Sequence, residues 1–146
     1  MSLGLNRPLV LDTNIVLDLW VFADEAARPL REALLAGELA WLATAAMRDE
    51  LARVLHYPQI APRLAYYELQ PPQVLAHFDR HARLVEPPAR APLRCSDPDD
   101  QKFIDLAVAR QALLLSKDRA VLSMRKRLAA WSVQAHAALP AFTPAP

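Results

Sequence analysis

The chain has 146 residues and a formal net charge of +1 at pH 7, with one cysteine, two glycines and thirteen prolines. This length suits one domain that buries about 70% of the surface exposed by its unfolded chain, so the fold needs no disulfide or zinc. One cysteine excludes an internal disulfide or a multi-cysteine metal site and fits a reducing cytoplasm, and two glycines exclude a glycine-rich phosphate loop or dinucleotide fingerprint.

Neither a membrane span nor a signal peptide is expected. No apolar run approaches the roughly 20 residues of a membrane-spanning helix. The first residues lack the positive charge and long apolar stretch of a signal peptide. We therefore expect a cytoplasmic protein without a membrane partner.

Apolar runs of strand length alternate with helical patterns along the first half of the chain. Pro8–Leu11 is apolar without alternation, as expected for a central parallel strand covered on both faces. Thr13 or Asn14 can cap the helix that follows, and Gly37 ends a later helical stretch. The other elements predicted here are a strand over Leu39–Ala43 and helices over Ile15–Val21, Asp24–Ala36 (with a restart at Pro29), Ala45–His56, Ile60–Leu69 and Pro71 to about Arg83.

The second half continues the alternation after one irregular stretch. Glu86–Pro98 contains four prolines and little that could pack, so it is predicted to be a loop. Asp99 or a neighbour caps the next helix, and Asp118 caps a short basic one. The elements predicted here are a short strand at Leu84–Val85, a helix to Arg110, a strand over Ala112–Leu115, a helix over Arg119–Leu128 and an edge strand over Trp131–Ala135.

This order of elements predicts an α/β fold with three layers, α/β/α, around a central, mostly parallel sheet of four to five strands. We expect residues 1–139 to form the single domain and residues 140–146 to form a proline-punctuated tail. Ligand sites in such sheets lie at the carboxyl ends of the strands. That rule brings together residues 12–14, 43–44 and 116–118.

Two acids lie on the apolar faces of predicted helices. Glu50 lies in the predicted helix Ala45–His56, and Asp100 lies at the start of a later helix. Each acid is three or four residues from apolar neighbours, so helical phase places it on the apolar face. Asp49 and Asp105 face away from these stripes. The neighbours that define the two stripes are Met47 and Val54 for the first and Phe103 and Ile104 for the second.

Asp12 and Asp118 add a carboxylate at the end of each of two strands. Singly, each acid has an ordinary alternative: a helix cap for Asp12 and Asp118, a bond to a backbone amide or an arginine for Glu50, and the favourable first helical turn for Asp100. Four carboxylates a few Å apart repel one another by roughly several kcal/mol per pair. A hard divalent cation removes that repulsion, so the four together predict a site for Mg²⁺ or Mn²⁺.

The segments that carry these acids resemble a PIN domain, the nuclease fold of many bacterial ribonuclease toxins. The resemblance spans about residues 8–135, and the segment Asp97–Asp100 followed by Phe103 most resembles the VapC-like branch of toxin–antitoxin toxin components. The matching segments are Leu9–Asn14, Arg48–Leu51, Asp97–Phe103 and Leu115–Asp118.

The resemblance implies a Mg²⁺-dependent ribonuclease, with Mn²⁺ as an alternative ion. It makes the four acids the catalytic and metal-binding residues and gives supporting roles to Asn14, by hydrogen bonding, and to Ser116, whose hydroxyl would lie near the metal or its water. RNA as substrate, a cognate antitoxin and a homodimer are implied partners, with residues 60–83 as a candidate dimer surface. The four acids are Asp12, Glu50, Asp100 and Asp118.

Basic residues gather immediately around the fourth acid, Asp118. They could hold RNA phosphates beside the metal, and the alternative is an ordinary solvated helix face. Lys117 stands where the resembled branch often has glycine, and we interpret it as a surface lysine rather than a phosphate contact. The cluster consists of Lys117, Arg119, Arg125, Lys126 and Arg127.

Two other functions remain open from the sequence. One is a catalytically silent PIN-like module that binds RNA or a protein. The other is an aspartyl phosphatase or phosphotransferase with Asp12 as nucleophile, although Asn14 stands where that class commonly has a second acid. His77 and His81 are spaced like a metal-binding pair, but they lack a third ligand.

Overall fold

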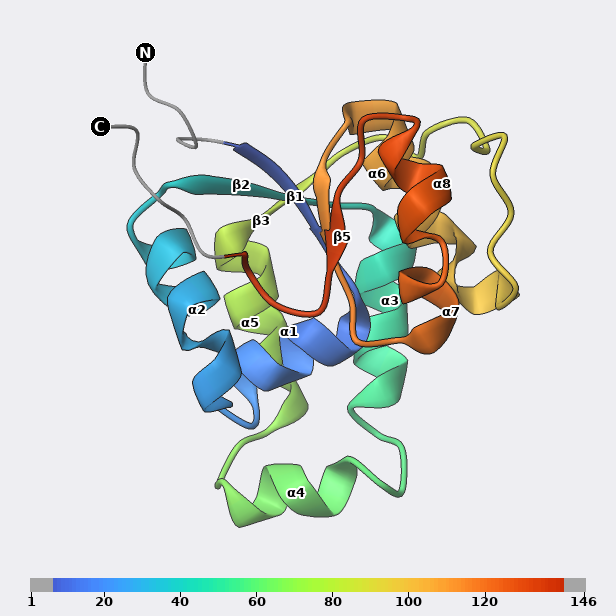
Figure 1. Cartoon of the computed structure of the whole chain (residues 1–146). Coiled ribbons are helices and arrows are strands. Elements are labelled where there is room, and N and C mark those ends of the chain that lie inside the picture. Colours follow the sequence, from blue (N-terminus) through green and yellow to red (C-terminus); the bar gives the residue numbers. More distant parts are fainter. Residues whose placement is uncertain (1–6, 141–146) are drawn as a thin grey trace.

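The computed structural model describes residues 7–140 and contains one five-stranded sheet flanked by helices, a three-layer α/β/α arrangement (Figure 1). The strand order is β3-β2-β1-β4-β5, and every neighbouring pair is parallel. The predicted fold class is therefore confirmed. The strands are β1 (Arg7–Leu11), β2 (Leu39–Ala43), β3 (Ala82–Leu84), β4 (Leu113–Leu115) and β5 (Ala135–His136).

Helices connect successive strands, as parallel pairing requires. Between β1 and β2 lie α1 (Thr13–Trp20), a short 3₁₀ helix η1 (Glu25–Ala27) and α2 (Arg28–Leu35). Between β2 and β3 lie α3 (Ala45–Val54), α4 (Ala61–Tyr66) and α5 (Pro71–His81). The remaining helices are the 3₁₀ helix η2 (Pro98–Asp100), α6 (Gln101–Arg110), α7 (Arg119–Leu122) and α8 (Arg125–Ala129).

Strand β1 is the central strand and sets the position of the site. Leu9 and Val10 are completely buried, which explains why the run is apolar without alternation. The chain leaves β1 toward β2 on one side and reaches β4 on the other, so the sheet has its topological switch point between β1 and β4. In open α/β sheets, ligands bind in the crevice at this point, at the carboxyl ends of the strands.

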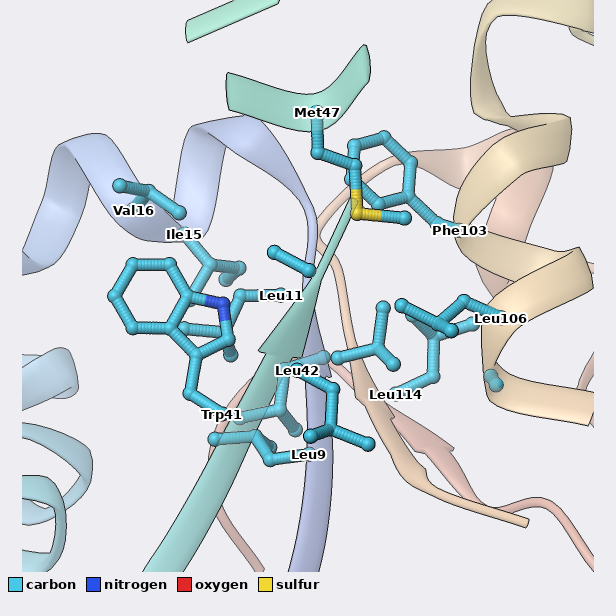
Figure 2. Packing of buried hydrophobic residues seen from close by; sticks show 14 of the residues in the cluster. Leu9, Leu11, Ile15, Val16, Trp41, Leu42, Met47, Phe103, Leu106 and Leu114 are labelled. Carbon is cyan, nitrogen blue, oxygen red and sulfur yellow. The ribbon is translucent and has the colours of Figure 1, made fainter. Parts of the chain in front are cut away.

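The core lies on this central part of the sheet. Figure 2 shows Leu9 and Leu11 of β1 beside Trp41 and Leu42 of β2, with Met47 of α3 and Phe103 of α6 at the same end of the cluster. Burying side chains of this size contributes about 1.5–3 kcal/mol each. These contacts fix α3 and α6 against the sheet, where α3 carries Glu50 and α6 follows directly after Asp100.

The strands predicted at residues 8–11, 39–43 and 112–115 are present within one residue of the expected bounds. The predicted helix Arg119–Leu128 was wrong, because α7 and α8 are separate. The Ser123 hydroxyl donates to the Ala120 carbonyl at 2.9 Å, and the Met124 N–H donates to Val121 at 3.0 Å instead of continuing the helical pattern. Buried Met124 sits at this break.

The last strand also differs from its prediction. Trp131 and Ser132 do not join the sheet, because their N–H groups bond back to Leu128 and Ala129 in the turn that ends α8. Ser132 has a left-handed backbone there, with φ of 64°. The edge strand is consequently Ala135–His136. The short strand predicted at Leu84–Val85 lies slightly earlier, as β3.

The proline-rich loop, residues 86–98, packs better than its composition predicts. Asp105 of α6 accepts a hydrogen bond from the Ala91 N–H at 2.8 Å, and Gln101 accepts one from the Cys95 N–H at 2.7 Å. Ala91 and Cys95 are both buried. Asp105 faces away from the core, as its helical phase predicts, and it holds this loop.

Within residues 7–140, no helix is long and apolar enough to cross a membrane. The predicted tail falls almost entirely on residues 141–146, which lie outside the described part of the chain.

Candidate metal centre

Three of the four predicted acids meet at the switch point of the sheet. Asp12, Asp100 and Asp118 each offer one carboxylate oxygen, and these oxygens lie within 4.8 Å of one another. Asp12 and Asp100 are only 4% and 7% exposed, and Asp118 is partly buried. Residues 106 positions apart in sequence are therefore joined in one acidic cluster, as the strand-end rule predicts.

Asp12 follows β1 and is fixed by its main chain. Its N–H donates to the Leu115 carbonyl at 3.0 Å, and its own carbonyl accepts from the first turn of α1. Its side chain makes no capping bond to that helix. The carboxylate instead accepts a hydrogen bond from the Ser116 hydroxyl at 2.6 Å. Asp12 is therefore the N-cap of α1 through its main chain, and its side chain is held mainly by Ser116.

Ser116 links two of the acids. Its hydroxyl donates to Asp12 and also accepts the N–H of Asp118 at 3.0 Å. Ser116 is completely buried, and its bond to Asp12 is shielded from water. It holds the end of β1 to the segment that follows β4.

Asp118 both caps a helix and joins the cluster. Its Oδ1 accepts the Ala120 N–H at 2.8 Å at the start of α7. The capping alternative is thus correct for this residue, and it is compatible with metal binding because a carboxylate has two oxygens.

Asp100 stands at the end of η2, immediately before α6. Its Oδ2 is buried and has no hydrogen-bond partner among residues 7–140. Burial, followed by the charges of Asp12 and Asp118, raises the pKa of Asp100 to about 7. Burial is also the main reason why the pKa of Asp12 is raised, although the Ser116 hydrogen bond opposes the shift.

Glu50 reaches the edge of this cluster but does not join it. Its side chain is 15% exposed and points inward from α3, as its helical phase predicts, and its charge helps to raise the pKa of Asp12. One Glu50 oxygen accepts the Thr13 hydroxyl, and the other lies 2.5 Å from the ammonium of Lys102. The expected four-carboxylate cluster is therefore a cluster of three with a paired fourth acid beside it.

Local sequence patterns do not reveal the roles of Thr13 and Lys102. Both stand inside the segments that carry the resemblance, next to Asp12 and two residues after Asp100, but their partner Glu50 is distant in sequence. Asn14 is exposed, and it acts on Asp12 through its main-chain N–H, which lowers the pKa of that carboxyl.

The basic residues on either side of Asp118 do not form one group. Lys117 is an exposed lysine that pairs with buried Asp18 of α1 at 2.5 Å. The others belong to α7 and α8, the helices that follow Asp118, and all four are exposed. They are Arg119, Arg125, Lys126 and Arg127.

The cluster has the chemistry of a divalent-cation site. All three donors are carboxylate oxygens, which hard ions such as Mg²⁺ and Mn²⁺ prefer. Buried polar atoms normally have a partner, so the unpaired Oδ2 of Asp100 indicates a ligand atom that a cation would satisfy. The residues present therefore fit such an ion.

Comparison with known protein families agrees with this geometry. A family model described as "PIN domain" matches residues 8–120, well over half of the chain and a range that includes all four predicted acids. No individual curated protein matches the chain. The family generally comprises metal-dependent nucleases. The fold, the acidic cluster and this match together show that the chain belongs to the PIN domain family.

Proposed function

We propose that this protein is a metal-dependent endoribonuclease that hydrolyses RNA phosphodiester bonds. The observation that carries the proposal is the cluster of Asp12, Asp100 and Asp118, whose oxygens converge within 4.8 Å at the switch point of the sheet. Mg²⁺ is the proposed ion, with Mn²⁺ as a substitute. A bound ion of this kind supplies an activated water and stabilises the leaving oxygen.

The chain's own residues would orient this chemistry. Ser116 fixes the Asp12 carboxylate and the start of the Asp118 segment, so two of the three donors cannot move independently. Asp100 is fixed by η2, where its N–H bonds to the Asp97 carbonyl at 3.0 Å. Such preorganisation lowers the free energy needed to bring the donors together around an ion.

The exposed basic residues of α7 and α8 support RNA as the substrate. These helices follow Asp118 directly, so their cations lie next in the chain to the acidic cluster. Lysine and arginine contacts to phosphates position a nucleic acid without reading its sequence, and they make its binding sensitive to salt.

The toxin of a type II toxin–antitoxin system is the biological role we propose. The resemblance of Asp97–Asp100 and Phe103 to VapC-like toxin components supports it. A cognate antitoxin in the cytoplasm would then be the partner. We also propose a homodimer through residues 60–83, where Tyr66 is 81% exposed. Growth arrest on expression, relieved by the product of a neighbouring gene, would test the toxin role.

The decisive experiment for the activity is RNA cleavage by purified protein with Mg²⁺ or Mn²⁺, compared with Asp12→Asn. The proposal expects metal-dependent cleavage that the substitution abolishes. Intact RNA with both ions, together with unchanged metal binding in Asp12→Asn, would refute it. RNA retained without metal would support the silent binding module instead, and a phosphoaspartyl adduct on Asp12 would support the phosphatase.

A further inference from the structure

Lys102 is the one cation that an ion pair connects to the acidic site within residues 7–140. Its ammonium lies 2.5 Å from Glu50 Oε1, and it also donates to the main-chain carbonyl of Asp99. The Lys102 side chain is only 25% exposed. Exposed lysine–carboxylate pairs contribute little and exchange partners freely, whereas this pair is largely removed from water.

The second oxygen of Glu50 is engaged as well. The Thr13 hydroxyl donates to Oε2, so both oxygens of Glu50 have partners. By contrast, Oδ2 of Asp100 has none within residues 7–140. Glu50 is thus held from two sides, by the residue after Asp12 and by the residue two positions after Asp100.

The balance of charges explains what this arrangement does. With an ion bound, the three clustered carboxylates carry three negative charges, and one divalent ion compensates two of them. Glu50 adds a fourth negative charge, which Lys102 compensates locally. A second divalent ion bound at Glu50 would have to stand a few Å from the Lys102 ammonium, where like charges repel strongly.

We propose that Lys102 keeps Glu50 out of metal coordination, so that the centre holds one ion on three carboxylates with Glu50 as a positioned carboxylate beside it. Lys102 is then a positioning residue that substitutes for a second cation. This inference rests on the proposed function, because it assumes that the cluster binds a divalent ion. Beyond the proposed function, it specifies that three carboxylates bind the ion and that the centre holds one ion.

A double-mutant cycle tests the inference without measuring activity. Mn²⁺ is the probe, and its binding to the whole protein is measured by calorimetric titration. Glu50→Gln should change the Mn²⁺ dissociation constant by less than about threefold, whereas Asp100→Asn should weaken it by more than about 100-fold. Lys102→Met keeps the aliphatic stem but frees Glu50. It should either add a second equivalent of Mn²⁺ or tighten the first at least about tenfold.

The double variant Lys102→Met/Glu50→Gln should lose that gain, and Lys102→Arg should behave as the unmodified protein. Circular dichroism of each variant checks that it is folded. The inference would be overturned if Glu50→Gln weakened Mn²⁺ binding as strongly as Asp100→Asn, or if Lys102→Met bound Mn²⁺ no better than the unmodified protein. In either case, RNA cleavage by the unmodified protein would leave the proposed function standing. No Mn²⁺ binding by the unmodified protein would overturn both.

Discussion

Helices α3 and α6 bring two acids to the same end of the sheet, yet the two acids have opposite surroundings. Glu50 on α3 is paired through both oxygens, with Thr13 and Lys102. Asp100, just before α6, is buried with one oxygen unpaired among residues 7–140, and its pKa is raised to about 7. Helical phase selects both residues equally, but within residues 7–140 only Asp100 keeps a buried oxygen without a partner, which a cation would satisfy.

The difference shows how an acidic site can separate its tasks. Carboxylates left without protein partners repel one another, and a cation relieves that repulsion. A carboxylate already paired with lysine gains less from the ion and remains available to position other groups. Substitutions at the two acids and at their supporting residues test this division.

The strongest contrast is between neutralising Asp100 and neutralising Glu50. Asp100→Asn removes a ligand and should weaken the Mn²⁺ affinity by more than about 100-fold. It should lower the rate of RNA cleavage at least as much. Glu50→Gln should lower cleavage while leaving Mn²⁺ affinity nearly unchanged. Calorimetry and a cleavage assay on the same preparations measure both. Equal losses of Mn²⁺ affinity in the two variants would remove the distinction.

Ser116→Ala tests whether the clustered acids depend on their hydrogen-bonded support. The substitution removes the donor to Asp12 and leaves the Asp118 N–H without its acceptor. We expect a loss of about 10–100-fold in Mn²⁺ affinity and about 1–3 kcal/mol in the free energy of unfolding. Ser123→Ala is the matched control, because that exposed hydroxyl only bonds the Ala120 carbonyl. Similar affinities in the two variants would contradict a role for Ser116.

The raised pKa of Asp100 predicts a pH dependence in two quantities. A metal ion must displace the Asp100 proton, so Mn²⁺ affinity should rise by up to about tenfold per pH unit as the pH approaches 7, and then level off. In the metal-free protein, the folded state binds this proton more tightly than the unfolded state, whose carboxyl has the ordinary value of 3.8. The free energy of unfolding should therefore fall as pH rises from about 4 to about 7.

Chemical denaturation at several pH values, with Asp100→Asn as the control, measures the second effect. The variant should show a flatter dependence, since its amide does not titrate. An equally steep fall in the variant would assign the pH dependence to other groups. Glu50→Gln should leave the slope of the unmodified protein in place.

The smallest expected effect concerns the basic residues of α8. Replacing Arg125, Lys126 and Arg127 with glutamine should weaken RNA binding and reduce its salt dependence, by about 0.7 in log–log slope for each single-strand phosphate that these side chains neutralise. Mn²⁺ affinity should not change. Lys117→Gln is the comparison, since Asp18 already holds that lysine. An unchanged salt slope in the triple variant would show that α8 faces solvent only.

The fold follows closely from local sequence patterns. Continuous apolar runs identified β1, β2 and β4 because these strands are largely buried on both faces. The apolar pattern was a weaker guide at the edge of the sheet. Strand β5 has only two residues, and it begins only after the turn at Ser132. At the break between α7 and α8, a serine hydroxyl bonds a helical carbonyl, and no apolar pattern marks that contact.

The site was predictable in part, for a related reason. Strand ends and helical phase depend on nearby residues, and they correctly brought Asp12, Asp100 and Asp118 together. The pairing of Glu50 depends on Lys102, which is 52 residues away in sequence and has no local pattern of its own. The anchoring of the proline-rich loop by Asp105 was missed for the same reason.

The anomalous X-ray signal from a crystal of this protein grown with Mn²⁺ most directly tests whether three carboxylates, and not four, bind the ion. We predict one ion bound by the carboxylates of Asp12, Asp100 and Asp118, with Glu50 still paired with Lys102. A crystal with no ion at this cluster, or one in which Glu50 has left Lys102 to coordinate the metal directly, would contradict this prediction.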